Sequence, residues 1–229
     1  MTTNSDGEAE WARRIGYTLG LTSADPGERA IALARLAAAR EGVNEALARF
    51  NEGWFQARDL GRLSGWYQEP ETRRLLAANS AAQRHAFPDA LWNRPHGPLT
   101  DWPGLPYALQ FLEWEARFPR EWTLHAKKWG TKQDLIRDLA RDAHRGAVRA
   151  RLVRLVTDAV ARAYRCKDRE YVRIARAVDG DDLRTALATA ADSDNPWARL
   201  HAGYVLRLLN DPTLPNSRRT WQIWCERAE

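Results

Sequence analysis

The clearest fold signal lies in residues 181–210, which read DDLRTALATAADSDNPWARLHAGYVLRLLN. Asn195 is a typical N-cap residue, and Pro196 fits the first position of a helix. The large apolar side chains that follow are spaced by three or four residues, which places them on one helix face: Trp197, Leu200, Tyr204 and Leu208. Residues 182–191 form a second helical stretch before the turn. The pattern therefore predicts a helix pair that ends at Asn210-Asp211-Pro212.

This pair resembles a HEAT-like repeat. The likeness rests on Asp194-Asn195-Pro196 at the turn, followed by Ala198 and Arg199 early in the second helix. It covers residues 181–210 of the 229-residue chain, and no second copy follows at a fixed period, as a solenoid would require. The resemblance implies antiparallel helices packed side by side at the C-terminal end.

Helical signals recur along the rest of the chain, whereas alternating strand patterns are nearly absent. Asp25-Pro26-Gly27-Glu28 is typical of a helix start, and we expect that helix to end near Arg40. The spacing of Val43, Leu47, Phe50 and Trp54 predicts a third helix with one buried face. Thr131 and Asp134 resemble a capping box that opens a long helix reaching about Tyr164. We predict an all-α bundle of about eight or nine helices.

Residues 87–106 differ from this pattern, because they contain five prolines and two glycines. Proline removes a backbone donor and fixes φ, so we expect no helix here. The same stretch carries Trp92 and Trp102, which are rare in flexible linkers. We therefore predict a single domain, residues 1–229, with an ordered loop at residues 87–106 that packs on it. This loop is also the best candidate for a boundary within the domain.

Composition favours a globular chain, with 44% hydrophobic and 28% charged residues. The polar start Met1–Glu10 does not fit a secretory signal, and no apolar run approaches the roughly 18 residues of a membrane span. Cys166 and Cys225 are isolated from each other and form no CxxC motif. We expect a cytoplasmic protein with two reduced thiols and no membrane contact.

The positive charge is concentrated in residues 117–176, which hold 17 basic and 7 acidic residues. Arginines 137, 141, 145 and 149 form a ridge, and three of them follow an aspartate by three residues, which is typical of a salt-bridged helix face. The cations that have no close acid in the sequence, apart from Asp134 near the lysines, are the expected binding residues: Lys127, Lys128, Lys132, Arg149 and Arg151. Three readings remain open, namely a nucleic-acid surface, a surface for an acidic protein partner, and a solvated face.

Five of the eleven tryptophans lie in residues 92–129. Core packing is one explanation, since tryptophan buries a large area. The alternatives are a pocket for a planar ligand, a cation site, or a stacking platform for bases. Trp122 and Trp129 lie beside the lysines at 127 and 128, so we include both in the expected binding surface.

Catalytic signals are weak. Glu121 and His125 are four residues apart and share a helix face, so they are the only candidates for an acid–base pair or a metal site. A second metal-binding copy is missing, and no nucleotide-binding or nucleophile motif is present. We predict neither a metal nor a cofactor.

The leading hypothesis is a non-catalytic helical module that contacts nucleic acid or an acidic partner through residues 117–176. One alternative is a cofactor-free tailoring enzyme or small-ligand binder with a tryptophan-lined central pocket. Another is a structural subunit of a larger assembly, in which tryptophan and arginine anchor the interfaces.

Overall fold

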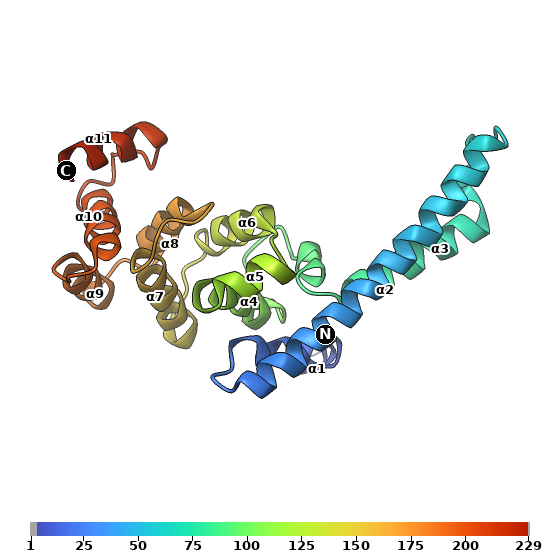
Figure 1. The fold of residues 1–229 in the computed structure, drawn as a ribbon, viewed down its shortest axis with the longest axis horizontal. Coiled ribbons are helices and arrows are strands. Elements are labelled where there is room, and N and C mark those ends of the chain that lie inside the picture. Colours follow the sequence, from blue (N-terminus) through green and yellow to red (C-terminus); the bar gives the residue numbers. More distant parts are fainter. Residues whose placement is uncertain (1–3, 229) are drawn as a thin grey trace. The chain divides into compact units, whose positions relative to one another are not determined.

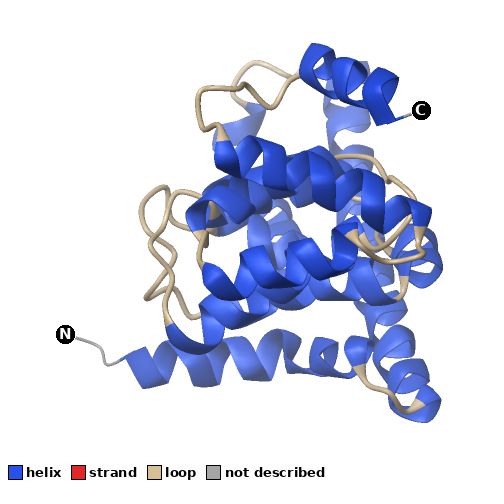
Figure 2. Ribbon diagram, turned by 90° about the vertical axis from the view of Figure 1, so that its left-hand side faces the viewer, coloured by secondary structure: helices blue, strands red, loops and turns tan. Residues whose placement is uncertain are grey.

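The computed structural model describes residues 4–228 and assigns them to helices, turns and loops, with no strand among them (Figure 2). This confirms the predicted all-α class. The described chain contains eleven α-helices and four short 3-10 helices, more than the eight or nine expected. None of these helices is both long and apolar enough to cross a membrane. The first three residues of the polar N-terminal stretch lie outside the described residues.

The chain divides into two compact units. Unit 1 comprises Met1–Arg94 and Arg120–Lys127, and unit 2 comprises Pro95–Pro119 and Lys128–Glu229. The first crossing between them, after Arg94, lies in the proline-rich loop 87–106. That loop contributes buried apolar side chains, Phe87 and Leu91 in unit 1 and Leu99 in unit 2. It also contains a short 3-10 helix, Asp89–Asn93, in a stretch where we expected no helix.

Unit 1 is built around a long helix pair. Its elements are α1 (Asn4–Ile15), η1 (Gly16–Thr22), α2 (Pro26–Asp59), η2 (Trp66–Gln68), α3 (Pro70–His85), η3 (Asp89–Asn93) and most of α5 (Pro119–His125). Figure 1 shows α2 and α3 lying side by side. Asp25 caps α2 as predicted, because its Oδ1 accepts a hydrogen bond from Gly27 N at 2.8 Å.

The two helices expected within residues 26–54 are one continuous helix, α2. Gly42 does not interrupt it, and the prediction of a buried face through Leu47 is wrong, since Leu47 is 43% exposed. Ala46 and Ala57 are buried instead. The other three predicted residues, Val43, Phe50 and Trp54, are half-buried, and the Phe50 ring lies 5.3 Å from that of Trp66, so they share the packed face with these alanines.

Unit 2 holds the remaining helices: α4 (Leu105–Arg117), α6 (Trp129–Leu139), α7 (Gly146–Val160), η4 (Asp168–Glu170), α8 (Tyr171–Ala177), α9 (Asp181–Ala191), α10 (Pro196–Asn210) and α11 (Arg218–Ala228). The α9–α10 pair forms as predicted, and Asn195 Oδ1 accepts from Trp197 N at 3.0 Å as the N-cap of α10. Helix α4 is the central core element, with Leu109, Phe111 and Trp114 all completely buried.

The long helix expected over residues 131–164 is two helices, separated by residues 140–145. Side chains stabilise the break. The buried His144 ring bonds the Leu139 carbonyl at 2.9 Å, and the carboxylate of Asp142 accepts from Leu99 N. Gly146 then opens α7 with a φ of +54°, a left-handed conformation that glycine adopts at little cost. The predicted capping box is also wrong, because α6 begins at Trp129 and places Thr131 inside the helix.

Candidate functional site

The sequence-predicted binding residues are divided between the two units. Trp122 and Lys127 belong to unit 1, whereas Lys128, Trp129, Lys132, Arg149 and Arg151 belong to unit 2. Trp122 is completely buried, so its ring packs in the interior and offers no face to a base. The tryptophan cluster is divided in the same way, with Trp92 in unit 1 and Trp102 and Trp114 in unit 2.

Arg149 and Arg151 have acidic partners that lie far away in the sequence. Arg149 donates to both carboxylate oxygens of Asp182 at 2.6 Å, and its hydrogen bond is the main reason that the pKa of Asp182 is lowered to about 2. Arg151 binds Glu113 in the same two-pronged manner, at 2.7 and 2.8 Å. The expectation that these arginines lack acids is therefore wrong, because their partners stand 33 and 38 residues away in sequence.

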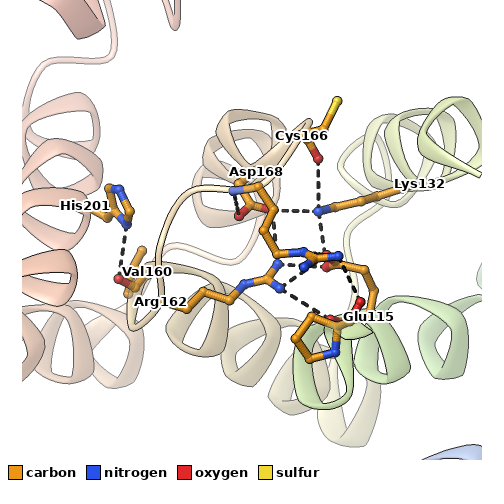
Figure 3. Close-up of polar contacts among 9 residues, drawn as sticks. Glu115, Lys132, Val160, Arg162, Cys166, Asp168 and His201 are labelled. Atoms are coloured by element: carbon orange, nitrogen blue, oxygen red, sulfur yellow. Dashed lines mark hydrogen bonds and ion pairs between the residues drawn. The ribbon is translucent and has the colours of Figure 1, made fainter. Parts of the chain in front are cut away.

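Lys132 lies in the interior of unit 2 rather than on its surface. It belongs to an ion cluster made of Glu115, Lys132, Arg162, Arg165 and Asp168 (Figure 3). Its Nζ lies 3.1 Å from Glu115 Oε2 and 2.6 Å from Asp168 Oδ1. Trp129 packs against the cluster, with its ring 5.5 Å from Lys132 Nζ and 5.4 Å from the Arg165 guanidinium.

The ion cluster joins three segments of unit 2. Glu115 comes from α4, Lys132 from α6, and Arg162, Arg165 and Asp168 from the connection between α7 and α8. Burial alone would raise the pKa of Glu115, but Lys132 and the two arginines more than offset that effect and hold it below its usual range. A buried carboxylate needs such partners, so the cluster ties the three segments together.

Glu121 and His125 connect α5 to α2 within unit 1. Glu121 Oε1 lies 3.6 Å from Arg29 Nε, and the His125 carbonyl accepts a hydrogen bond from Arg40. The described residues contain no group of three or more His, Cys, Asp or Glu side chains that could hold a metal ion. The link to α2 thus uses the side chain of Glu121 and the backbone of His125.

Four cations from the end of α6, the turn that follows it and α8 share a cleft. This arginine cleft has a volume of about 520 Å³ and is lined by Arg137, Ala140, Arg141, Arg173 and Arg176. All four charged side chains of the lining are arginines, and no carboxylate is among the lining residues. Arg141 and Arg173 are the most accessible, with 71% and 55% of their side chains exposed.

Neighbouring groups hold these arginines in place. Glu170, at the end of η4, accepts from Arg137 at 2.9 Å and from Arg173 at 2.8 Å. Although burial works in the opposite direction, these bonds and one from Gln133 lower the pKa of Glu170 to about 2. Arg176 donates to the carbonyls of Leu208 and Leu214, while its buried Nε has no partner among the described residues. The cleft is thus a set of oriented guanidinium groups.

Arg137 and Arg141 were predicted to belong to a salt-bridged helix face, and Arg173 and Arg176 were not among the predicted binding residues. A usable signal was present, because residues 173 and 176 are three apart and share one face of α8. The convergence of that face with the end of α6 depends on tertiary structure.

Comparison of the chain with models of protein families, with curated proteins and with solved structures yields no match in any of the three.

Proposed function

We propose that unit 2 binds nucleic acid, and that the arginine cleft holds its sugar–phosphate backbone. The observation that carries this proposal is the cleft of about 520 Å³ whose four charged lining residues are all arginines. A guanidinium presents several N–H groups in a planar fork that matches the oxygens of a phosphate. A polymer with one phosphate per nucleotide can engage more than one exposed arginine at a time.

Local charge supports the same conclusion. Glu170 and Asp138 pair with arginines of the cleft, and the charge of Asp134 also acts on Arg137, so four guanidinium groups face three carboxylates and one positive charge remains in excess. Glu170 also keeps Arg137 and Arg173 in fixed orientations before any ligand arrives. A fixed guanidinium loses less side-chain entropy on binding than a free one, which favours affinity.

The test is a binding titration with labelled single-stranded and duplex oligonucleotides, followed by fluorescence anisotropy at several salt concentrations. We expect the affinity to fall with salt, with a log–log slope of roughly −0.7 per phosphate contact on single strands and −0.9 on duplex. The double variant Arg141→Gln/Arg173→Gln should lose about two such contacts and show a correspondingly shallower slope.

The matched control is Arg154→Gln/Arg199→Gln, which removes the same charge from two exposed arginines of unit 2 outside the cleft. It should bind nearly as well as the unmodified chain. Equal losses in the two double variants would show that net charge alone governs binding. If the protein binds polyglutamate and no oligonucleotide at low salt, the cleft serves an acidic protein and the nucleic-acid proposal is wrong.

A further inference from the structure

A second site belongs to unit 1, where the N-terminal part of α2 packs against η1. It is an open groove with a volume of about 210 Å³. A Cβ atom on Gly20 would stand only 3.1 Å from Cβ of the buried Ala32, so η1 and α2 are in close contact here. The lining residues are Tyr17, Gly20, Glu28, Ile31, Ala32 and Arg35.

Large aliphatic side chains are exposed at the groove. Ile31 lines it and is 61% exposed, and Leu19, which precedes Gly20 in η1, is 55% exposed. The nearby Ala34 of α2 is exposed as well, and its small side chain leaves room for a second helix to approach. A cavity of about 150 Å³ is known to hold benzene, which has six carbons. The groove therefore has room for the four-carbon side chain of one more isoleucine.

Two opposite charges lie on either side of Ile31. Glu28 precedes it by three residues and Arg35 follows it by four, so the three side chains share one face of α2. The two charges are about 10 Å apart along the helix axis. Arg35 forms no hydrogen bond or ion pair with the described residues. Glu28 accepts one hydrogen bond from Ser23 Oγ, at 2.6 Å, and no cation of the described chain pairs with it.

This arrangement is complementary to a copy of itself. A two-fold axis near Ile31 and perpendicular to α2 makes the helix and its copy antiparallel, and every contact across such an interface occurs twice. Glu28 then lies opposite Arg35 of the second copy, Arg35 lies opposite Glu28 of the second copy, and the two isoleucines meet at the centre. Arg29, the other charge of this turn, is already paired with Glu121 of α5 at 3.6 Å.

We infer that the groove between η1 and α2 is a homodimer interface, in which the α2 helices of two copies pack antiparallel around Ile31. Burial of the two isoleucines supplies the apolar contact, and the two Glu28–Arg35 pairs fix the register and the direction of the helices. The groove spans about two turns of α2, so the dimer is weak, with a dissociation constant of roughly 1–100 μM. The interface lies in unit 1, and the inference does not depend on nucleic-acid binding by unit 2.

The experiment is sedimentation velocity of the full chain at concentrations from about 1 to 500 μM. We expect a monomer at the lowest concentration and a growing fraction of dimer toward the highest. Ile31→Ser removes the aliphatic group from an exposed position, so it should keep the fold and weaken dimerisation by about tenfold or more. Circular dichroism confirms the helix content of this variant and of those below.

Reversal of the charges tests the pairing itself. Glu28→Arg brings two arginines together at each pair, and Arg35→Glu brings two glutamates together, so each variant alone should lose the dimer. A mixture of the two variants places an arginine opposite a glutamate in both pairs and should associate as a heterodimer. The double variant Glu28→Arg/Arg35→Glu should dimerise as the unmodified chain does. Damage to the helix by either substitution would persist in the mixture, whereas lost pairing is restored there.

The matched control is Glu52→Arg, which reverses the same charge at an exposed position of α2 about 31 Å beyond Ile31 along the axis. It should dimerise as the unmodified chain does. The inference is overturned if the unmodified chain stays monomeric at about 500 μM, in which case the groove serves another protein or none. It is also overturned if Glu28→Arg and Glu52→Arg weaken the dimer equally, or if the mixture of the two single variants stays monomeric.

Discussion

The ammonium group of Lys132 lies 3.1 Å from Glu115 Oε2, and neither side chain is exposed to solvent. Arg162 and Arg165 donate to the same carboxylate at 2.7 Å each. Three cations from two other segments therefore surround Glu115, which is a buried anion on α4. Desolvation makes any imbalance in such a group expensive, so the cluster should respond strongly to the loss of its central charge.

The first prediction concerns that central charge. Glu115→Gln leaves three cations around a neutral amide, and we expect the free energy of unfolding to fall by roughly 3–5 kcal/mol. Urea denaturation followed by circular dichroism measures it. Asp192→Asn, an exposed carboxylate of unit 2, serves as the control and should change the stability by no more than about 0.5 kcal/mol. A loss below about 1 kcal/mol in Glu115→Gln would show that solvent or rearrangement already compensates the cluster.

The second prediction concerns pH and Glu170. The pKa of Glu170 in the folded chain is about 2, below its ordinary value of 4.5. The folded state thus favours the charged form of Glu170. The contribution of this carboxylate to the free energy of unfolding is fully present above about pH 4.5 and is lost as the pH falls toward 2.

We expect the urea midpoint of the unmodified chain to fall across this acidic range, and the fall to be shallower in Glu170→Gln. Other carboxylates also titrate there, so the comparison is the difference between the two curves. Parallel curves for the two proteins would contradict the prediction. Asp192→Asn again provides the reference for loss of a solvent-exposed carboxylate.

The sequence predicted local features well because local chemistry determines them. Asp25 and Asn195 cap helices as expected, since an N-cap needs only a side-chain oxygen and the next few backbone N–H groups. The break at residues 140–145 was missed. One of its contacts, His144 with Leu139, is local, but the other joins Asp142 to Leu99, 43 residues away, and leaves no periodic signal in the sequence.

The candidate sites were harder to predict for the same reason. Arg149 has no close acid in the sequence and Lys132 has none apart from Asp134, yet Asp182 and Glu115 reach them through the fold. An unpaired cation in the sequence is therefore not an unpaired cation in space. Arg137, which has an aspartate three residues before it, pairs instead with Glu170 and lines the arginine cleft.

The third prediction concerns the thiols. Neither cysteine forms a disulfide, as expected from their isolation in the sequence, and Cys166 is exposed whereas Cys225 is half-buried in α11. We expect a thiol-reactive chromophore to modify the native protein in a fast phase and a slow phase, because access differs between the two sites. Cys166→Ser should remove the fast phase. Equal rates for both thiols in the native protein would contradict the half-buried position of Cys225.

The last prediction concerns the packing of α11 on α10. Gly203 lies in α10, and a Cβ atom at this position would stand 2.8 Å from Cζ2 of Trp224. The indole cannot simply turn away, because Trp224 Nε1 donates to the Leu200 carbonyl at 2.9 Å. Overpacking of this kind costs roughly 1–3 kcal/mol, which exceeds the gain of about 1 kcal/mol that alanine brings over glycine in a helix. We expect Gly203→Ala to lower the free energy of unfolding.

Two controls separate packing from helix propensity. Gly130→Ala in α6 adds a Cβ with nothing within 4 Å, so it should be neutral or stabilising by up to about 1 kcal/mol. In a Trp224→Leu background the clash at residue 203 is relieved, and Gly203→Ala should then no longer destabilise the chain. Urea denaturation of the single and double variants measures this coupling. A Gly203→Ala chain as stable as the unmodified protein would mean that α11 does not pack on α10 through Trp224.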